Sequence, residues 1–234
     1  MQHIAYSASV AALLALGFSG SALAQPITIK AGIANLDPNS SATPARGPFT
    51  PVDALSLRVR SQSTPFFSVA WDFPSTPWQA ELALGLPPTH DVALVVLKPA
   101  SVPGSVAAQD GTTIAKVRQV SPAVFVNYRF GDTNSPIRPF IGLGLNYTKF
   151  DKARSTAAND AINGGPTTIK LKDSKGLAFQ LGVTANLGGP WSVTGVWSTA
   201  QAKTTQTSNT LGVERVADIR FHPSVFIVSV GYTF

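Results

Sequence analysis

The feature that most constrains the fold is a strict alternation of large apolar residues with small or polar ones in residues 224–234. In an extended strand the even positions share one face: Phe226, Val228, Val230, Tyr232 and Phe234. The odd positions share the other face: Val225, Ile227, Ser229, Gly231 and Thr233. A water-soluble sandwich would have to bury both faces, whereas a strand of a transmembrane barrel needs its apolar face only toward lipid. The segment therefore favours a membrane-spanning β-barrel.

The same period of two recurs along the chain and predicts about eight strands. These strands are residues 27–34, 65–73, 78–86, 124–130, 141–148, 177–187, 191–198 and 224–234. The mature chain has no run of about 20 apolar residues, which a membrane helix would need. We therefore expect an all-β fold, an eight-stranded antiparallel transmembrane β-barrel.

Connections between these strands alternate in length. Residues 74–77, 131–136 and 188–190 are short turns, while residues 36–62, 87–113, 151–172 and 199–220 are long loops. Outer-membrane barrels have short periplasmic turns and long outer loops, which places both ends of the barrel in the periplasm. Aromatic residues at strand ends are expected to form the periplasmic girdle: Trp71, Phe73, Trp78, Phe130, Trp191, Tyr232 and Phe234. Tyr147 and Phe150 are expected at the opposite interface, and Phe234 is also the expected signal for the barrel-assembly machinery.

Residues 1–24 have the pattern of a secretory signal peptide, although no Lys or Arg precedes the apolar run at 10–18. Ala22 and Ala24 occupy the positions that a signal peptidase prefers. Residues 25–234 would then be the barrel. An exported barrel of this kind is expected in the outer membrane.

Composition narrows the possible partners. The chain has no cysteine, so disulfides and thiolate metal sites are excluded. Its formal charge is +6, but Lys and Arg are scattered and form no basic cluster of the kind that binds nucleic acid. Membrane lipids and anionic lipopolysaccharide are the expected partners instead, and nucleic acid is not.

Residues 137–150 (IRPFIGLGLNYTKF) resemble the fifth strand of the OmpW family of outer-membrane proteins. Residues 80–92, 120–130 and 222–234 agree with the same family, in strand order and in the alternation of loop lengths. The resemblance implies an eight-stranded barrel with a narrow, partly apolar lumen. It also implies passage of small hydrophobic compounds across the lipopolysaccharide leaflet, as in alkane-import relatives.

Four charged residues would point into the lumen near its periplasmic end: Lys30, Asp72, Glu81 and Arg129. Isolated buried charges are prohibitively costly, so these side chains are expected to pair and form a charged floor. Above this floor the inward positions are apolar: Phe66, Phe125, Val196, Val225 and Ile227. The pattern predicts an apolar vestibule that opens outward.

A charged floor would obstruct an apolar solute and therefore favours a sideways exit into the membrane. Pro122 marks the expected place, because proline cannot donate a ladder hydrogen bond. Two alternatives stay open. The charges could merely stabilise the barrel while Pro122 only ends an outer loop, and the whole protein could be a structural, adhesive or receptor barrel without transport.

Catalysis, metals and cofactors are not expected. His222-Pro223-Ser224 has the spacing seen in barrel deacylases, but no carboxylate follows to orient the imidazole. His90 is interpreted as an outer-loop residue without further metal ligands. Gly142-Leu143-Gly144 precedes no helix, so it is interpreted as relief of crowding in a narrow barrel rather than as a nucleotide loop.

Overall fold

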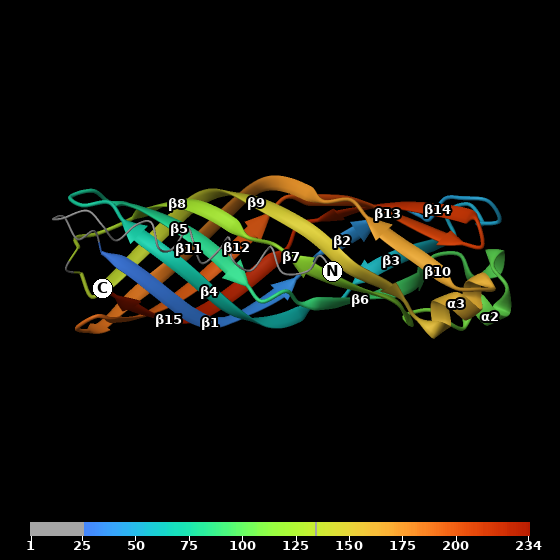
Figure 1. Ribbon diagram of the computed structural model, residues 1–234, viewed down its shortest axis with the longest axis horizontal. Coiled ribbons are helices and arrows are strands. Elements are labelled where there is room, and N and C mark those ends of the chain that lie inside the picture. Colours follow the sequence, from blue (N-terminus) through green and yellow to red (C-terminus); the bar gives the residue numbers. More distant parts are fainter. Residues whose placement is uncertain (1–25, 134) are drawn as a thin grey trace, which may run out of the picture.

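The computed structural model describes residues 26–133 and 135–234. The expected signal peptide, residues 1–24, lies outside the described residues. Eight antiparallel strands close into a barrel (Figure 1). In order around the barrel they are β1 (Ile27–Asp37), β4 (Gln62–Asp72), β5 (Trp78–Gly85), β8 (Ala123–Arg129), β9 (Ile137–Ser155), β11 (Ser174–Gly188), β12 (Trp191–Ala200) and β15 (Ser224–Thr233).

Closure comes from pairing of β1 with β15, from Thr28 opposite Thr233 to Asp37 opposite Ser224. A closed barrel leaves no strand edge unpaired, which is required where no water can satisfy backbone groups. The predicted eight-stranded barrel is confirmed, and every predicted strand overlaps an observed one.

The period of two separates the two faces of the barrel wall. On β11, Leu181 and Val183 are 47% and 44% exposed on the outside, whereas Gln180 and Thr184 are buried inside. The aromatic residues at the strand ends near the short turns also lie outside, and six of them contact one another edge to face. Trp78, Tyr128 and Phe130 form one such row, and Trp191, Tyr232 and Phe234 form another.

The sequence had suggested that the long connections are loops, but the structure shows strands in them. They contain β2 (Ser40–Ala42), β3 (Leu55–Val59), β6 (Thr89–Val96), β7 (Thr113–Val120), β10 (Thr167–Leu171), β13 (Ala202–Thr210) and β14 (Val213–Phe221). One sheet is formed by β3, β6, β7 and the outer part of β9, and the other has the order β10-β13-β14-β2. We call this pair of sheets the outer double sheet; it extends the barrel at the right of Figure 1.

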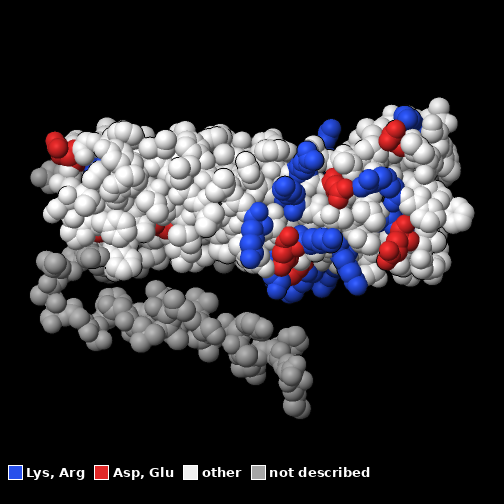
Figure 2. All heavy atoms as spheres, turned by 90° about the horizontal axis from the view of Figure 1, so that it is seen from above, with Lys and Arg blue, Asp and Glu red and all other residues white. Residues whose placement is uncertain are grey.

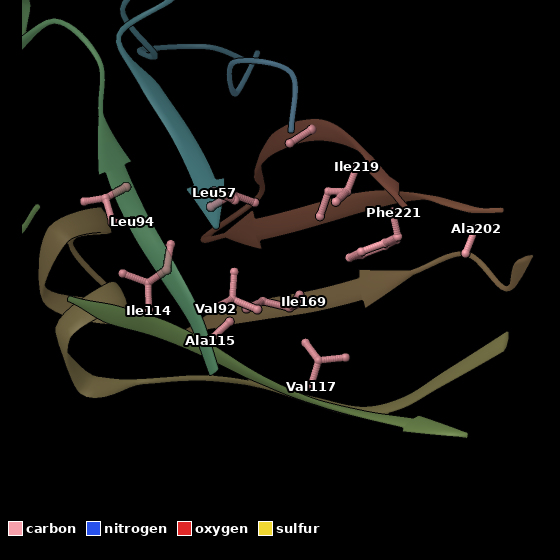
Figure 3. Close-up of a cluster of buried hydrophobic side chains, with 11 residues drawn as sticks. Leu57, Val92, Leu94, Ile114, Ala115, Val117, Ile169, Ala202, Ile219 and Phe221 are labelled. Atoms are coloured by element: carbon pink, nitrogen blue, oxygen red, sulfur yellow. The ribbon is translucent and has the colours of Figure 1, made fainter. Parts of the chain in front are cut away.

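A second apolar core holds the outer double sheet together (Figure 3). Val92 and Leu94 of β6 face Ile169 of β10 and Ile219 of β14 across the two sheets. Burial of large apolar side chains contributes roughly 1.5–3 kcal/mol each, so these segments fold rather than remain loops.

Phe150 and His90 depart from expectation because both belong to the packed outer part of the protein rather than to its surface or a loop. Phe150 does not join the outer aromatic girdle but stacks on Phe221, with ring centroids 6.0 Å apart, because even positions of β9 point inward. His90 is not a loop residue: it lies in β6 and is 2% exposed. Tyr147, an odd position, does face outward.

The helical segments are short: η1 (Pro99–Ser101), α2 (Gly104–Ala107) and α3 (Ala157–Asn163). Thr156 caps α3 by accepting a hydrogen bond from the backbone N–H of Asn159, and Gly164 ends it with a φ of 76°. Among the described residues, no helix has the length and hydropathy needed to cross a bilayer.

Candidate functional site in the barrel lumen

The outer half of the lumen is apolar. Phe66 from β4 and Ile227 from β15 are buried there, with Val196 and Val225 packed against them. Phe125 from β8 is 3% exposed and lines the same space. All of them occupy inward positions of their strands, so the fold brings together the five residues that the alternation had placed inside.

Phe66, Phe125, Val225 and Ile227 line a cavity of about 130 Å³, whereas Val196 packs against this cluster without bordering the cavity. A cavity of about 150 Å³ lined by apolar side chains is large enough to take up benzene. Phe150 and Phe221 border the cavity on its outer side, where the outer double sheet begins. The space therefore suits a small apolar molecule.

A glycine shapes the wall next to this cavity. A Cβ at Gly142 would lie 2.0 Å from Asn127 Oδ1. The inward glycine thus leaves room for the Asn127 side chain of the neighbouring strand, in agreement with relief of crowding in a narrow barrel.

A hydrogen-bonded network closes the lumen below the cavity. Glu81 lies at its centre and is 3% exposed. Its Oε1 accepts from Lys30 Nζ at 2.9 Å and from Ser68 Oγ at 2.7 Å. Its Oε2 accepts from Asn127 Nδ2 at 3.0 Å and from Gln180 Nε2 at 3.2 Å. The donors come from β1, β4, β8 and β11, so the network spans the lumen from wall to wall.

A second ion pair continues the network toward the periplasmic end. Arg129 NH1 donates to both oxygens of Asp72, at 2.7 and 2.6 Å. Gln79 joins the two pairs, because its Nε2 donates to Asp72 at 2.7 Å and its Oε1 accepts from Asn127 at 3.1 Å. The structure thus pairs Lys30 with Glu81 and Arg129 with Asp72 and links all four into one floor.

The charged residues were singled out from the sequence, but four uncharged members were not: Ser68, Gln79, Asn127 and Gln180. They share the inward parity of the charged residues, and that parity is the signal that could have identified them. Arg138 is a charged inward residue that was also missed; it is 5% exposed, and it borders an open cavity of about 640 Å³ beneath the floor.

The barrel wall is interrupted beside the cavity. Pairing of β5 with β8 ends at Ala83 opposite Ala123, and pairing of β6 with β7 begins where Gln119 N donates to Pro88 O. Between these points, residues 84–87 and 120–122 share no backbone hydrogen bond in the described chain. We call this interruption the seam.

The cavity reaches the seam. Gly85 and Ser121 both border the cavity, as does Leu84, whose side chain is 37% exposed on the outside of the barrel. Pro122 accepts from Tyr147 N at 3.1 Å, on the side of β9. The interruption therefore lies on the opposite side of Pro122, toward β5.

The other motifs show no catalytic or metal-binding geometry. His222 is exposed, and its imidazole makes no hydrogen bond with the described residues. His90 Nδ1 lies 3.1 Å from the carbonyl oxygen of Arg60, and burial lowers the pKa of this histidine. No group of three potential metal-ligating side chains occurs in the described part of the chain.

Comparisons with known proteins agree with this architecture. The OmpW family model matches residues 26–234. Outer membrane protein W of Vibrio cholerae is 31% identical over 162 residues, which are 67% of this chain and 73% of that protein. The crystal structure of the outer membrane protein OprG from Pseudomonas aeruginosa is 25% identical with a TM-score of 0.77, over 90% of this chain and 96% of OprG. The solid-state NMR structure of outer membrane protein AlkL in DMPC bilayers shares the fold, with a TM-score of 0.60 at 18% identity, over 92% of this chain and 94% of AlkL.

Proposed function

Because the chain belongs to the OmpW family and is an outer-membrane β-barrel, we propose that it is a narrow channel for small hydrophobic molecules crossing the outer membrane. The solute reaches the apolar cavity from outside and leaves sideways through the seam into the bilayer. Phe66, Phe125, Val196, Val225 and Ile227 form the apolar path, and the seam beside Pro122 is the lateral opening.

One observation carries this proposal: the cavity is closed below by the charged floor and interrupted at its side by the seam. An apolar solute that passed through the floor would separate Lys30 from Glu81, which leaves two uncompensated buried charges. Leaving through the seam breaks no backbone hydrogen bond, because residues 84–87 and 120–122 share none. The sideways route is therefore the less costly one.

The outer part of the route is a chain of smaller cavities inside the outer double sheet. A cavity of about 10 Å³ shares Gln119, Phe150 and Phe221 with the large cavity. On its other side it shares Gln206 with a cavity of about 70 Å³ between the two sheets. The stacked rings of Phe150 and Phe221 have to move for a solute to pass, so they act as the outer constriction.

The test seals the seam. Cysteines at Gly85 and Ser121 flank it and both border the cavity, and the natural chain has no cysteine to interfere. A matched control carries cysteines at Val126 and Leu143, which are opposite each other in the intact β8–β9 ladder. Uptake of a radiolabelled small alkane is measured in cells before and after oxidation, with crosslinking followed on gels.

Oxidation should lower uptake about tenfold in the seam variant, with recovery after reduction, and should leave the control unchanged. Full uptake through a crosslinked seam would refute the sideways route. Equal uptake by cells that lack the protein would refute transport itself.

A structural or adhesive role is the second candidate. The outer double sheet carries exposed apolar residues at its turns: Phe49 is 91% exposed and Leu211 is 78% exposed. Exposed apolar side chains of this kind can contact a partner surface. In that case Phe49→Ser and Leu211→Ser would abolish cell adhesion, while crosslinking the seam would change nothing.

A further inference from the structure

Basic residues that are scattered in the sequence come together on one side of the folded protein. Figure 2 shows Lys and Arg gathered where the barrel meets the outer double sheet, while the neighbouring barrel surface is nearly free of charge. Five exposed residues form what we call the basic patch: Lys149, Lys172, Lys175, Lys203 and Arg220.

Strand register explains why these residues are neighbours. Lys149 lies two positions beyond Tyr147 on β9, and Tyr147 is opposite Lys175 on β11, whose Nζ is 5.9 Å from the tyrosine ring centroid. The backbone N–H of Lys203 donates to Ser174 Oγ at 3.0 Å, next to Lys175. Arg220 is directly opposite Lys203 in the β13–β14 ladder.

Lys172 joins the patch through its main chain. Its carbonyl oxygen accepts from Thr204 Oγ1 at 2.6 Å, and Thr204 follows Lys203. The patch therefore covers adjoining segments of β9, β11, β13 and β14 together with the residue that follows β10.

The patch lies at a defined height, just beyond the apolar band. On β11, Lys175 lies two residues before the outward Leu177, which is 64% exposed. On β9, Lys149 lies two residues after Tyr147 and four after Leu145, which is 66% exposed. One step of two residues along a strand is about 6.6 Å. The cations thus lie where the headgroups of the outer leaflet begin.

Among the described residues, no carboxylate forms a close ion pair with these five cations, although Lys149 attracts Asp151 at longer range. None of them forms an ion pair in the described residues, and residues 1–25 and 134 contain no Asp or Glu. The nearest acidic side chains have other partners. Asp151 pairs with Arg118, Asp218 pairs with Arg46, and Asp173 accepts from the Tyr147 hydroxyl.

The pairing of Lys203 with Arg220 favours a bound anion. Like charges directly opposite each other across two strands are destabilising. An anionic group between the side chains would reverse that repulsion, and a phosphate offers acceptors to both. We propose that the basic patch binds the phosphate groups of lipid A, the anionic glycolipid of the outer leaflet, and so fixes the barrel in an oriented lipid contact.

Binding is tested with purified protein in uncharged detergent. The ligand is lipid A with two phosphates, and the reference ligand is the same lipid after enzymatic dephosphorylation. The test variant is Lys203→Gln with Arg220→Gln. The matched control is Arg58→Gln with Lys98→Gln, which removes two exposed cations outside the basic patch, one on β3 and one just after β6. Folding of each variant is checked by heat-modifiable gel migration.

Each basic side chain near an anionic membrane surface contributes about a factor of five in affinity, so the double variant should bind phosphorylated lipid A about thirtyfold more weakly. The control should bind like the natural protein, and raising the salt concentration should weaken both. If the double variant does not fold, Lys149→Gln and Lys175→Gln should each lower affinity about fivefold.

Three results would overturn the proposal. Equal affinity for dephosphorylated lipid would show that only the acyl chains are bound. Displacement of lipid A by millimolar inorganic phosphate would make the patch a site for free anions. Tighter binding of a sulfated polysaccharide than of lipid A would assign it to a different partner.

Discussion

Replacing Glu81 by Gln should strongly destabilise the barrel. The substitution keeps the size of the side chain but removes the charge that compensates Lys30, whose exposed fraction is 4%. Breaking a buried ion pair by neutralising one partner costs about 3–5 kcal/mol, because the other charge stays buried and unpaired. Ser68 retains an acceptor in the amide oxygen, but the side-chain amides of Asn127 and Gln180 lose theirs, so the loss reports on Lys30 together with these two hydrogen bonds.

The chain offers a closely matched control. Glu214 is the only other glutamate of the sequence, and it lies exposed on β14. Glu214→Gln should change stability by less than about 0.5 kcal/mol, as is usual for surface substitutions. Unfolding in urea is followed by the fluorescence of the 4 tryptophans and by heat-modifiable gel migration.

A double-mutant cycle isolates the pair. Lys30→Met combined with Glu81→Gln should cost at least about 2 kcal/mol less than the sum of the two single substitutions. Each single variant leaves one buried charge without its partner, whereas the double variant leaves none. Additive losses, or a Glu81→Gln loss no larger than that of Glu214→Gln, would refute the argument that the floor is held by compensated buried charge.

Three further predictions concern other parts of the protein. Gly142→Ala places a Cβ against Asn127 and should cost about 1–3 kcal/mol in urea unfolding, whereas Gly195→Ala, which has open space around the new Cβ, should cost less than 1 kcal/mol; equal losses would contradict the crowding argument. Burial lowers the pKa of His90 from its ordinary value of 6.5, so the unfolded state takes up the proton first; resistance of the outer double sheet to proteolysis should be complete above pH 6.5 and should fall as the pH drops below it, with His90→Phe removing this dependence. Phe234→Ala removes an edge-to-face contact with ring centroids 4.9 Å apart and the proposed assembly signal, so the yield of heat-modifiable barrel in cells should fall; an unchanged yield in cells would argue against recognition of Phe234.

The barrel strands could be predicted from the sequence because each faces lipid on one side and the lumen on the other. That asymmetry gives a strict period of two, as in Leu177, Leu181 and Val183 of β11. The charged floor followed from the same parity, combined with the cost of burying Lys30 and Glu81 unpaired.

The outer double sheet was missed for a physical reason. Residues 202–210 (AKTTQTSNT) have almost no apolar side chains, and they become a strand only because β10 and β14 supply backbone partners on both sides. Such pairing depends on distant segments rather than on local pattern. The contact between Asn127 and Gln180 was missed for the same reason, since β9 lies between their strands.

Closure of the barrel joins residues that are far apart in the chain: the hydroxyls of Thr28 and Thr233 lie 2.9 Å apart across 205 positions. The barrel therefore cannot close before β15 has been synthesised, and one edge of β1 stays unpaired until then. Until then its free edge invites pairing with other polypeptides. We therefore expect the unclosed chain to need protection from such pairing until β15 is in place.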